Sequence, residues 1–280
     1  DLGDAAGKVA VNPVTGFVPP CATSYWSGDS GSSWSGLGLS PDPAGTCSTS
    51  GFNKYSDAPD GPFVEKGAAA QILRQGNAPA GTSTSHAVNR SVLTHVPGTG
   101  LTALTSANSG MDTNLVKFIR GEDTDNEKGG GPANTTRPSI HGDVIHSRPL
   151  PVNYGADKGG VTVFYGANDG TLRALDAATG VERWAFVAPE FFPRLSRLKS
   201  NSPLVAYPNM PDLDLAPTRK DYFFDGSTGV YQDATSANVW IFPTMRRGGR
   251  MIYALDVSDV ANPRFKWKTG CPNLDNDTGC

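Results

Sequence analysis

The sequence predicts a mainly β protein, with an incomplete β-propeller that follows a loop-rich region containing two short helices. Three observations support this prediction. Residues 161–184 have the pattern of three short strands that are joined by tight turns and end on a Trp. Residues 239–268 repeat that order, and internal self-similarity marks repeat architectures. The chain of 280 residues contains 33 Gly and 22 Pro, which favours many turns over long helices.

The first repeat alternates large apolar residues with small or polar ones. Strands are predicted at 161–166 and 171–176, because one side of each can face a core. Between them, Asn-Asp-Gly at 168–170 tolerates the positive φ of a tight hairpin. Asp176 is expected to hold the next turn by accepting backbone N–H groups. Trp184 ends the third strand with a large apolar surface, so the unit has the pattern of most of one propeller blade.

The second repeat has the same order with a longer final turn. Strands are predicted at 239–242, 251–256 and 264–268, and the middle one ends in the same Ala-Leu-Asp as residues 174–176. Two further strands are expected, one within 139–149 and one at 221–225. A short helix is expected through Leu195 and Leu198, where it would cover a sheet edge.

Composition changes divide the chain into three segments. Residues 1–60 form a Gly/Ser-rich extension that a disulfide is expected to close. Residues 61–137 form a connector, in which apolar residues at three- and four-residue spacing predict helices at 62–75 and 113–120 before a Gly-rich linker. Residues 138–280 hold the first blades of the incomplete propeller.

The four cysteines predict two local disulfides, Cys21 with Cys47 and Cys271 with Cys280, in an oxidising compartment. Zinc is the rival reading, but neither pair has the close spacing of zinc ligands with nearby histidines. Free thiols are the remaining alternative. The disulfide between Cys21 and Cys47 would hold the N-terminal loop closed.

The charge balance excludes some classes of partner. The net charge of −3 gives no reason to expect nucleic-acid binding. No apolar run approaches the roughly 20 residues of a transmembrane helix, so no transmembrane segment is predicted. Asp1 opens no signal peptide, so the chain is expected to be mature, cut or incomplete.

Two acidic runs carry candidate calcium ligands, since calcium loops place oxygen side chains at alternate positions. The alternative is a solvated acidic loop for the first run and a disulfide-closed hairpin loop with Asn/Asp turn chemistry for the second. No cofactor is otherwise expected. The candidate ligands are Glu122, Asp123, Asp125 and Glu127 in one run and Asn273, Asp275 and Asp277 in the other.

Two tryptophans in the N-terminal extension are candidate contact residues. Trp26 and Trp34 lie in a low-complexity run, where they either form an aromatic contact surface or pack on a neighbouring sheet. His141 and His146 are five apart, so neither a helix nor a strand aligns them for a metal. No nucleophile and base can be paired from the sequence, so no catalytic residue is predicted.

Four motifs in order resemble the PilC/PilY family of type IV pilus-associated proteins. They are Phe-Val-Glu-Lys-Gly-Ala at 63–68, Ile-His-Gly-Asp-Val-Ile-His-Ser-Arg-Pro at 140–149, Tyr-Gly-Ala-Asn-Asp-Gly-Thr-Leu at 165–172 and Gly-Arg-Met-Ile-Tyr-Ala-Leu-Asp at 249–256. The resemblance covers the chain from about residue 60 to its end. It implies large, surface-exposed proteins that end in a modified propeller of quinoprotein-like blades.

The same resemblance implies a non-enzymatic role in pilus assembly, in retraction control and in adhesion at the pilus tip. The implied location is the outer cell surface, reached through the periplasm. Implied partners are minor pilins or other envelope proteins and the remainder of the protein's own chain. The sequence departs from the family pattern: it holds fewer blades, it lacks the von Willebrand A-like domain, and neither acidic run matches the family's calcium loop residue by residue.

Two other functions compete with this reading. A scaffold subunit of a larger envelope or filament assembly would also need its open strand edges covered by other protein. A quinoprotein dehydrogenase fragment shares the Asp-Gly and Ala-Leu-Asp blade signature, but such enzymes usually have an adjacent Cys-Cys pair, which this sequence lacks. We therefore expect no enzymatic activity.

Overall fold

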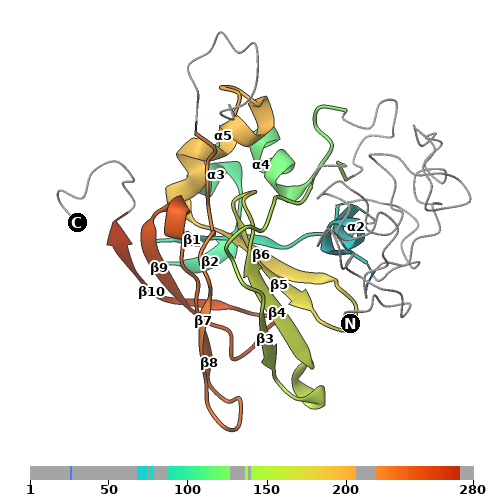
Figure 1. Ribbon diagram of the computed structural model, residues 1–280, viewed down its shortest axis with the longest axis vertical. Coiled ribbons are helices and arrows are strands. Elements are labelled where there is room, and N and C mark those ends of the chain that lie inside the picture. Colours follow the sequence, from blue (N-terminus) through green and yellow to red (C-terminus); the bar gives the residue numbers. More distant parts are fainter. Residues whose placement is uncertain are drawn as a thin grey trace, which may run out of the picture. The chain divides into compact units, whose positions relative to one another are not determined.

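The computed structural model describes residues 26, 68–74, 76–78, 88–126, 136–137, 140–205 and 219–271. Within these residues the chain is mainly β, as predicted, with two sheets and few short helices (Figure 1). The strands are β1 (Val92–Val96), β2 (Gly100–Ala103), β3 (Leu150–Asn153), β4 (Val161–Gly166), β5 (Thr171–Asp176), β6 (Glu182–Val187), β7 (Gly229–Gln232), β8 (Val239–Phe242), β9 (Arg250–Asp256) and β10 (Arg264–Cys271).

The first sheet has six strands in the order β2-β1-β6-β5-β4-β3. Strands β3 to β6 follow one another in sequence and form a meander through short connections, with Leu150 opposite Phe164 in the β3–β4 pair. Strand β1 extends the sheet by pairing in parallel with β6, where Val92 lies opposite Ala185. The strands predicted for the first repeat are thereby confirmed.

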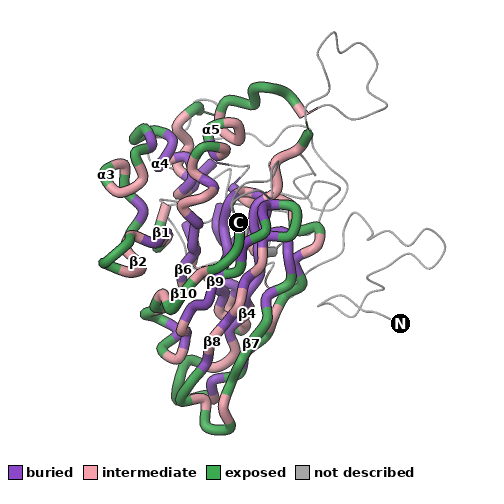
Figure 2. The backbone as a smooth tube through the Cα atoms, turned by 90° about the vertical axis from the view of Figure 1, so that its left-hand side faces the viewer, coloured by how far each residue is buried: buried purple, intermediate pink, exposed green. Residues whose placement is uncertain are grey.

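The second sheet has four antiparallel strands in the order β10-β9-β8-β7. Its strands also follow one another in sequence, so it is a second four-stranded meander. The register shifts between Phe265 and Trp267, which marks a bulge in β10. Strand β7 is exposed along its whole length, whereas buried residues concentrate in β4, β5, β6 and β9 (Figure 2). The three strands of the second repeat are therefore confirmed as well.

Carboxylates hold the hairpin turns. Asp176 Oδ1 accepts the amides of Ala178 at 2.9 Å and Thr179 at 3.0 Å, as predicted. In the preceding turn Asp169 Oδ1 accepts the amide of Thr171, and Gly170 takes φ 94°, which a side chain would disfavour. These aspartates satisfy backbone donors that a tight turn leaves without a ladder partner.

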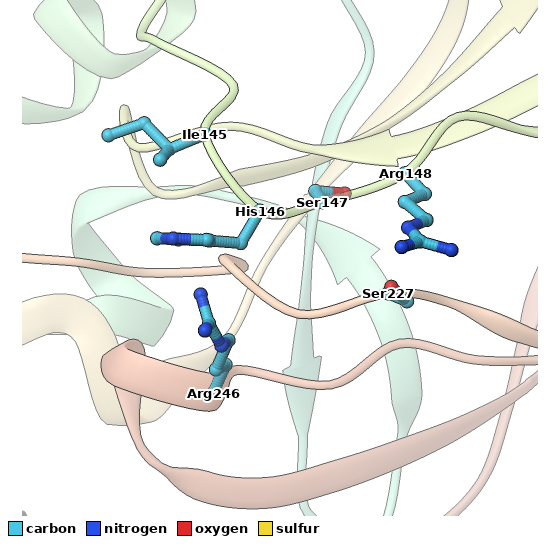
Figure 3. A pocket seen from close by; sticks show the side chains of 6 residues that line it. All are labelled: Ile145, His146, Ser147, Arg148, Ser227 and Arg246. Atoms are coloured by element: carbon cyan, nitrogen blue, oxygen red, sulfur yellow. The ribbon is translucent and has the colours of Figure 1, made fainter.

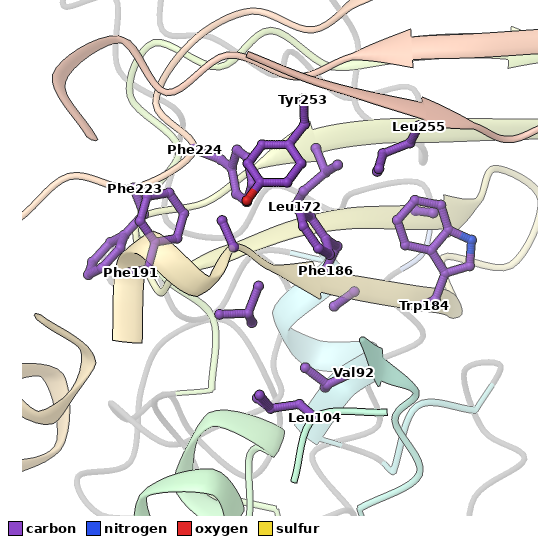
Figure 4. Close-up of a cluster of buried hydrophobic side chains, with 14 of the residues drawn as sticks. Val92, Leu104, Leu172, Trp184, Phe186, Phe191, Phe223, Phe224, Tyr253 and Leu255 are labelled. Atoms are coloured by element: carbon purple, nitrogen blue, oxygen red, sulfur yellow. The ribbon is translucent and has the colours of Figure 1, made fainter. Parts of the chain in front are cut away.

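The core lies between the two sheets and is rich in aromatic side chains (Figure 4). Phe186 of β6 meets Tyr253 of β9 edge to face, with ring centroids 5.2 Å apart. Within the first sheet, the rings of Phe164 and Trp184 pack with their centroids 5.8 Å apart. Each large buried ring contributes on the order of 2–3 kcal/mol through the surface it removes from water. Leu172 and Leu255, both fully buried, fill the space beside these rings.

The helices are short. They are α2 (Ala68–Arg74), α3 (Ser106–Ser109), α4 (Thr113–Arg120) and α5 (Phe192–Ser200), with 3-10 turns at Ala156–Lys158, Pro189–Phe191 and Arg246–Gly248. Helix α4 confirms the prediction at 113–120, and α5 confirms the helix through Leu195 and Leu198. Helix α2 lies within the predicted range 62–75, whose first residues are outside the described part. None of the described helices has the length and apolar content needed to cross a membrane.

Two predicted strands are wrong. Residues 221–225 are irregular, because the Phe223 amide donates to the Asn168 side chain at 3.2 Å and takes no place in a ladder. Residues 140–149 are irregular too, and β3 begins only at Leu150. There the Ser147 hydroxyl takes the Gly166 amide at 2.8 Å, and Pro149 has no N–H to give.

The chain folds as two compact units. The described residues within 1–90, 120–143 and 175–182 belong to one unit, and those within 91–119, 144–174 and 183–280 belong to the other. The sheet core described above belongs to the second unit. Among the described residues neither sheet closes into a barrel, and no propeller closes. The three-segment division at residues 60 and 137 stays a prediction.

Candidate functional site

A pocket of about 390 Å³ lies in the second unit, and three basic side chains line it (Figure 3). Two stretches of chain form its walls. One is the irregular segment before β3, which belongs to the 140–149 motif, and the other combines residue 227 with the turn before β9. The lining residues are Ile145, His146, Ser147, Arg148, Ser227 and Arg246.

A buried carboxylate orients the histidine of this pocket. Nδ1 of His146 lies 2.8 Å from Oδ2 of Asp225, whose side chain is 0% exposed. Because an ionised carboxylate only accepts hydrogen bonds, Nδ1 carries the proton and donates it, which fixes the ring. The same Oδ2 lies 3.9 Å from Nη1 of Arg246. Asp225 therefore organises two of the three basic groups of the pocket.

Close backbone contacts hold the second wall together. The Gly226 amide donates to the Thr244 carbonyl at 3.1 Å. A Cβ atom on Gly248 would lie 1.8 Å from the Phe223 carbonyl oxygen, so only glycine fits there. Arg194 donates to the carbonyls of Tyr222 at 3.0 Å and Gly248 at 2.8 Å. The turn that carries Arg246 is thus anchored to the segment that carries Asp225.

The pocket groups suit charge recognition better than nucleophilic chemistry. The Ser147 hydroxyl is buried and accepts the Gly166 amide, so it anchors its segment to β4. Arg148 and Arg246 are exposed, and each presents a guanidinium group with five N–H donors. Guanidinium groups bind carboxylate and phosphate through paired hydrogen bonds. The arrangement can hold an anion.

A second polar cluster joins β9, β10 and the 3-10 turn at Pro189–Phe191. Tyr253 donates to Glu190 Oε2 at 2.5 Å, and Lys268 Nζ donates to the other carboxylate oxygen. Burial by itself would raise the pKa of Glu190, but the hydrogen bonds from Lys268 and Tyr253 outweigh it and the pKa lies below its ordinary value. Burial, aided by the hydrogen bond to Glu190, raises the pKa of Tyr253. This cluster ties strands together.

His95 lies beside that cluster and stacks on Phe265, with ring centroids 3.8 Å apart. Burial lowers the pKa of His95 below 6.5, and the positive charge of Lys268 lowers it further. Both effects favour the neutral form of the ring.

The predicted contact and cysteine residues fall partly within the described chain. Trp26 is half-buried, and its indole N–H donates to the Ala177 carbonyl at 2.8 Å. Cys271 ends β10, with its backbone opposite Arg250. Trp34, Cys21, Cys47 and Cys280 lie outside the described residues, so the disulfides and the aromatic surface stay predictions.

Only some of the candidate calcium ligands lie within the described residues. Glu122 accepts a hydrogen bond from Arg120 at 2.9 Å, and Asp123 and Asp125 follow it in the described chain. In the part of the chain that the structure describes, no three His, Cys, Asp or Glu side chains gather as a metal site would need. Calcium binding stays a prediction, because four of its seven candidate ligands lie outside the described residues: Glu127, Asn273, Asp275 and Asp277.

The pairing of His146 with Asp225 was not predicted. The motif at 140–149 is recognisable in the sequence, but the carboxylate that pairs with its His146 comes 79 residues later. Asp225 lay in a predicted strand, which gave no reason to place it near a histidine. The one available signal was the Arg-Arg-Gly-Gly turn at 246–249, which gathers basic residues between glycines.

Comparison with known proteins gives sequence relatives but no family-model match. A type IV pilus biogenesis factor PilY1 homolog of Xylella fastidiosa is 29% identical over 196 residues, which is 60% of this chain and 14% of that protein. PilY1 proteins from two strains of Pseudomonas aeruginosa are 28% and 30% identical over 51% and 55% of this chain, and 13% and 14% of their own length.

One solved structure is also similar, the C-terminal domain of Pseudomonas aeruginosa PilY1. It is 26% identical over 40% of this chain and 19% of that chain, with a TM-score of 0.26, too low to support a comparison of folds.

A mainly β chain with these relatives falls among proteins related to type IV pilus biogenesis factors. More particularly, the relatives it is similar to are PilY1 proteins, which confirms the resemblance to the PilC/PilY family that the four motifs indicate. The chain spans only 13–14% of the length of these relatives.

Proposed function

We propose that the chain is part of a non-enzymatic type IV pilus biogenesis factor. The proposed roles are pilus assembly, retraction control and adhesion at the pilus tip, at the outer cell surface reached through the periplasm. The observation that supports this proposal most directly is the sequence identity of 28–30% to PilY1 proteins over about half of the chain. Minor pilins and the rest of the protein's own chain are the proposed partners.

The two meanders are proposed to be consecutive blades of a quinoprotein-like propeller. Each has four strands in sequence order, β3 to β6 and β7 to β10, and the two pack through Phe186 and Tyr253. Four-stranded blades arranged around an axis are how propellers limit their open edges. In this proposal further blades complete the ring.

The blade motifs support an architectural role over catalysis. The carboxylates of Asp169, Asp176 and Asp256 each accept a backbone amide two residues further along, at 3.0, 2.9 and 3.1 Å. These are the aspartates of the Asp-Gly and Ala-Leu-Asp signatures that quinone enzymes share. Their hydrogen bonds build turns, which accounts for the motifs without a cofactor.

A genetic test separates this proposal from the scaffold alternative. Deleting the gene in its own bacterium is expected to reduce surface pili and adhesion, and a plasmid copy is expected to restore both. Cross-linking of the intact protein is expected to capture minor pilins. Normal piliation and adhesion after deletion, with cross-links to another envelope protein, would show that the protein is a scaffold for a different assembly.

A further inference from the structure

We propose that the pocket around His146 binds an oxyanion, a carboxylate or phosphate group carried by a larger molecule, between Arg148 and Arg246. The proposal is independent of the pilus role, since it depends only on the charges and geometry of the pocket.

The charges of the pocket are not balanced. The ion pairs of the described residues leave Arg148 without an acidic partner. Arg246 has only the long 3.9 Å contact with Asp225, and the same carboxylate oxygen already accepts the shorter hydrogen bond from His146. Two permanent positive charges therefore share one buried negative charge, which leaves a net positive pocket. A bound anion would balance this excess positive charge.

The two arginines reach the pocket from different walls. Figure 3 shows the Arg246 side chain rising from its turn toward His146, while the Arg148 side chain lies next to Ser227. Asp225 fixes the His146 end, so that end is organised before any ligand arrives. Arg148 and Ser227 are exposed and line the opposite end. A ligand can thus meet a guanidinium at each end of the pocket.

The volume indicates that the oxyanion is one group of a larger ligand. A cavity of about 390 Å³ falls in the range of small-molecule sites, which extends from about 300 to 1,000 Å³. An isolated phosphate or acetate would fill only part of it. The polar rim and the apolar side chain of Ile145 suit a molecule with both charged and uncharged parts.

The backbone of Arg246 supports a role for its side chain. The residue has φ 48°, a left-handed conformation that favours glycine. Gly248 and Gly249 follow in the same turn and would suit this conformation. The strained position nevertheless carries an arginine, whose side chain is 49% exposed. Residues held in sparsely populated backbone conformations cluster at functional positions.

The test is a titration of the purified chain at constant ionic strength. Inorganic phosphate and acetate are added separately, and the amide and arginine side-chain signals are followed by NMR. Saturable shifts are expected at Gly226, Ser227 and Arg246. The double variant Arg148→Gln/Arg246→Gln is expected to raise the apparent Kd at least tenfold.

Two further variants guard against indirect effects. Arg264→Gln removes the same charge from an exposed position on β10, outside the pocket lining, and is expected to leave the Kd within twofold of wild type. Arg246→Gly removes the guanidinium but suits the positive φ, so it is expected to fold as stably as wild type and still lose binding.

The outcomes decide both the site and the chemistry. Saturation by phosphate alone assigns a phosphate-bearing ligand, and saturation by acetate alone assigns a carboxylate. Saturation by both supports the shared oxyanion site. The proposal is overturned if neither probe saturates, or if Arg264→Gln weakens binding as much as the double variant does.

Discussion

The indole Nε1–H of Trp184 donates a 2.7 Å hydrogen bond to the main-chain carbonyl of Val260. Trp184 lies on β6 of the first sheet, and Val260 lies in the turn between β9 and β10 of the second. The ring is 1% exposed and packs on Phe164. The Trp that ends the first sequence repeat therefore connects it to the second.

Replacing Trp184 with Phe is expected to lower the free energy of unfolding by about 2–4 kcal/mol. The variant leaves the buried Val260 carbonyl without its donor, which costs about 1–3 kcal/mol, and the smaller ring leaves a cavity. Urea denaturation followed by circular dichroism measures the change. Trp267→Phe is the matched control, because Trp267 is 43% exposed and should change stability by less than about 0.5 kcal/mol. Equal effects in the two variants would contradict this role for the hydrogen bond.

Adding a methyl group at Gly248 is expected to destabilise the protein by at least about 2 kcal/mol. The new Cβ would lie 1.8 Å from the Phe223 carbonyl oxygen, and that oxygen belongs to backbone that cannot rotate away. Thermal unfolding of Gly248→Ala checks the prediction. Gly229→Ala is the comparison, since its Cβ would meet Phe242 at an ordinary 3.7 Å. A Gly248→Ala protein as stable as Gly229→Ala would refute the close contact.

Stability is expected to fall as the pH is lowered through about 6.5, because of His95. Burial and Lys268 lower the pKa of His95 in the folded protein, so the unfolded chain takes up the proton first as the pH falls. The contribution of the neutral His95 ring to the free energy of unfolding is therefore fully present above about pH 6.5 and decreases below it. Urea denaturation at pH 8 and at pH 5.5 measures the difference for wild type and for His95→Gln. The variant is expected to lose part of the pH dependence, and an unchanged dependence would show that other groups cause it.

The two repeats could be predicted because their information is local. Alternation along 161–166 and 171–176, with Asn-Asp-Gly between them, specifies a hairpin whatever surrounds it. Residues 221–225 hold a run of three aromatic residues, which also favours a strand, but they are irregular. There Asn168 takes the Phe223 amide, a contact that depends on a distant part of the chain.

The pocket could not be predicted for the same reason. His146 and Arg148 belong to a recognisable motif, but their roles depend on Asp225 and Arg246, which only the folded chain brings to them. A sequence pattern carries periodicity and turn chemistry, whereas it says little about which irregular segments will meet. Only the charge of the 246–249 turn was visible in advance.

The parallel pairing of β1 with β6 has a consequence for the order of folding. In the described sheets, every other pair of neighbouring strands is consecutive in sequence. The β1–β6 pair is not: the Thr94 hydroxyl donates to the Val187 carbonyl, 93 residues further along the chain. Closing so long a loop carries an entropic penalty that short hairpins avoid, so this pairing is expected to form last. Until it does, β6 is an open edge that another chain can pair with. Newly made protein is then expected to aggregate more readily through β6 than the finished fold does, because the β1–β2 hairpin covers that edge once it docks.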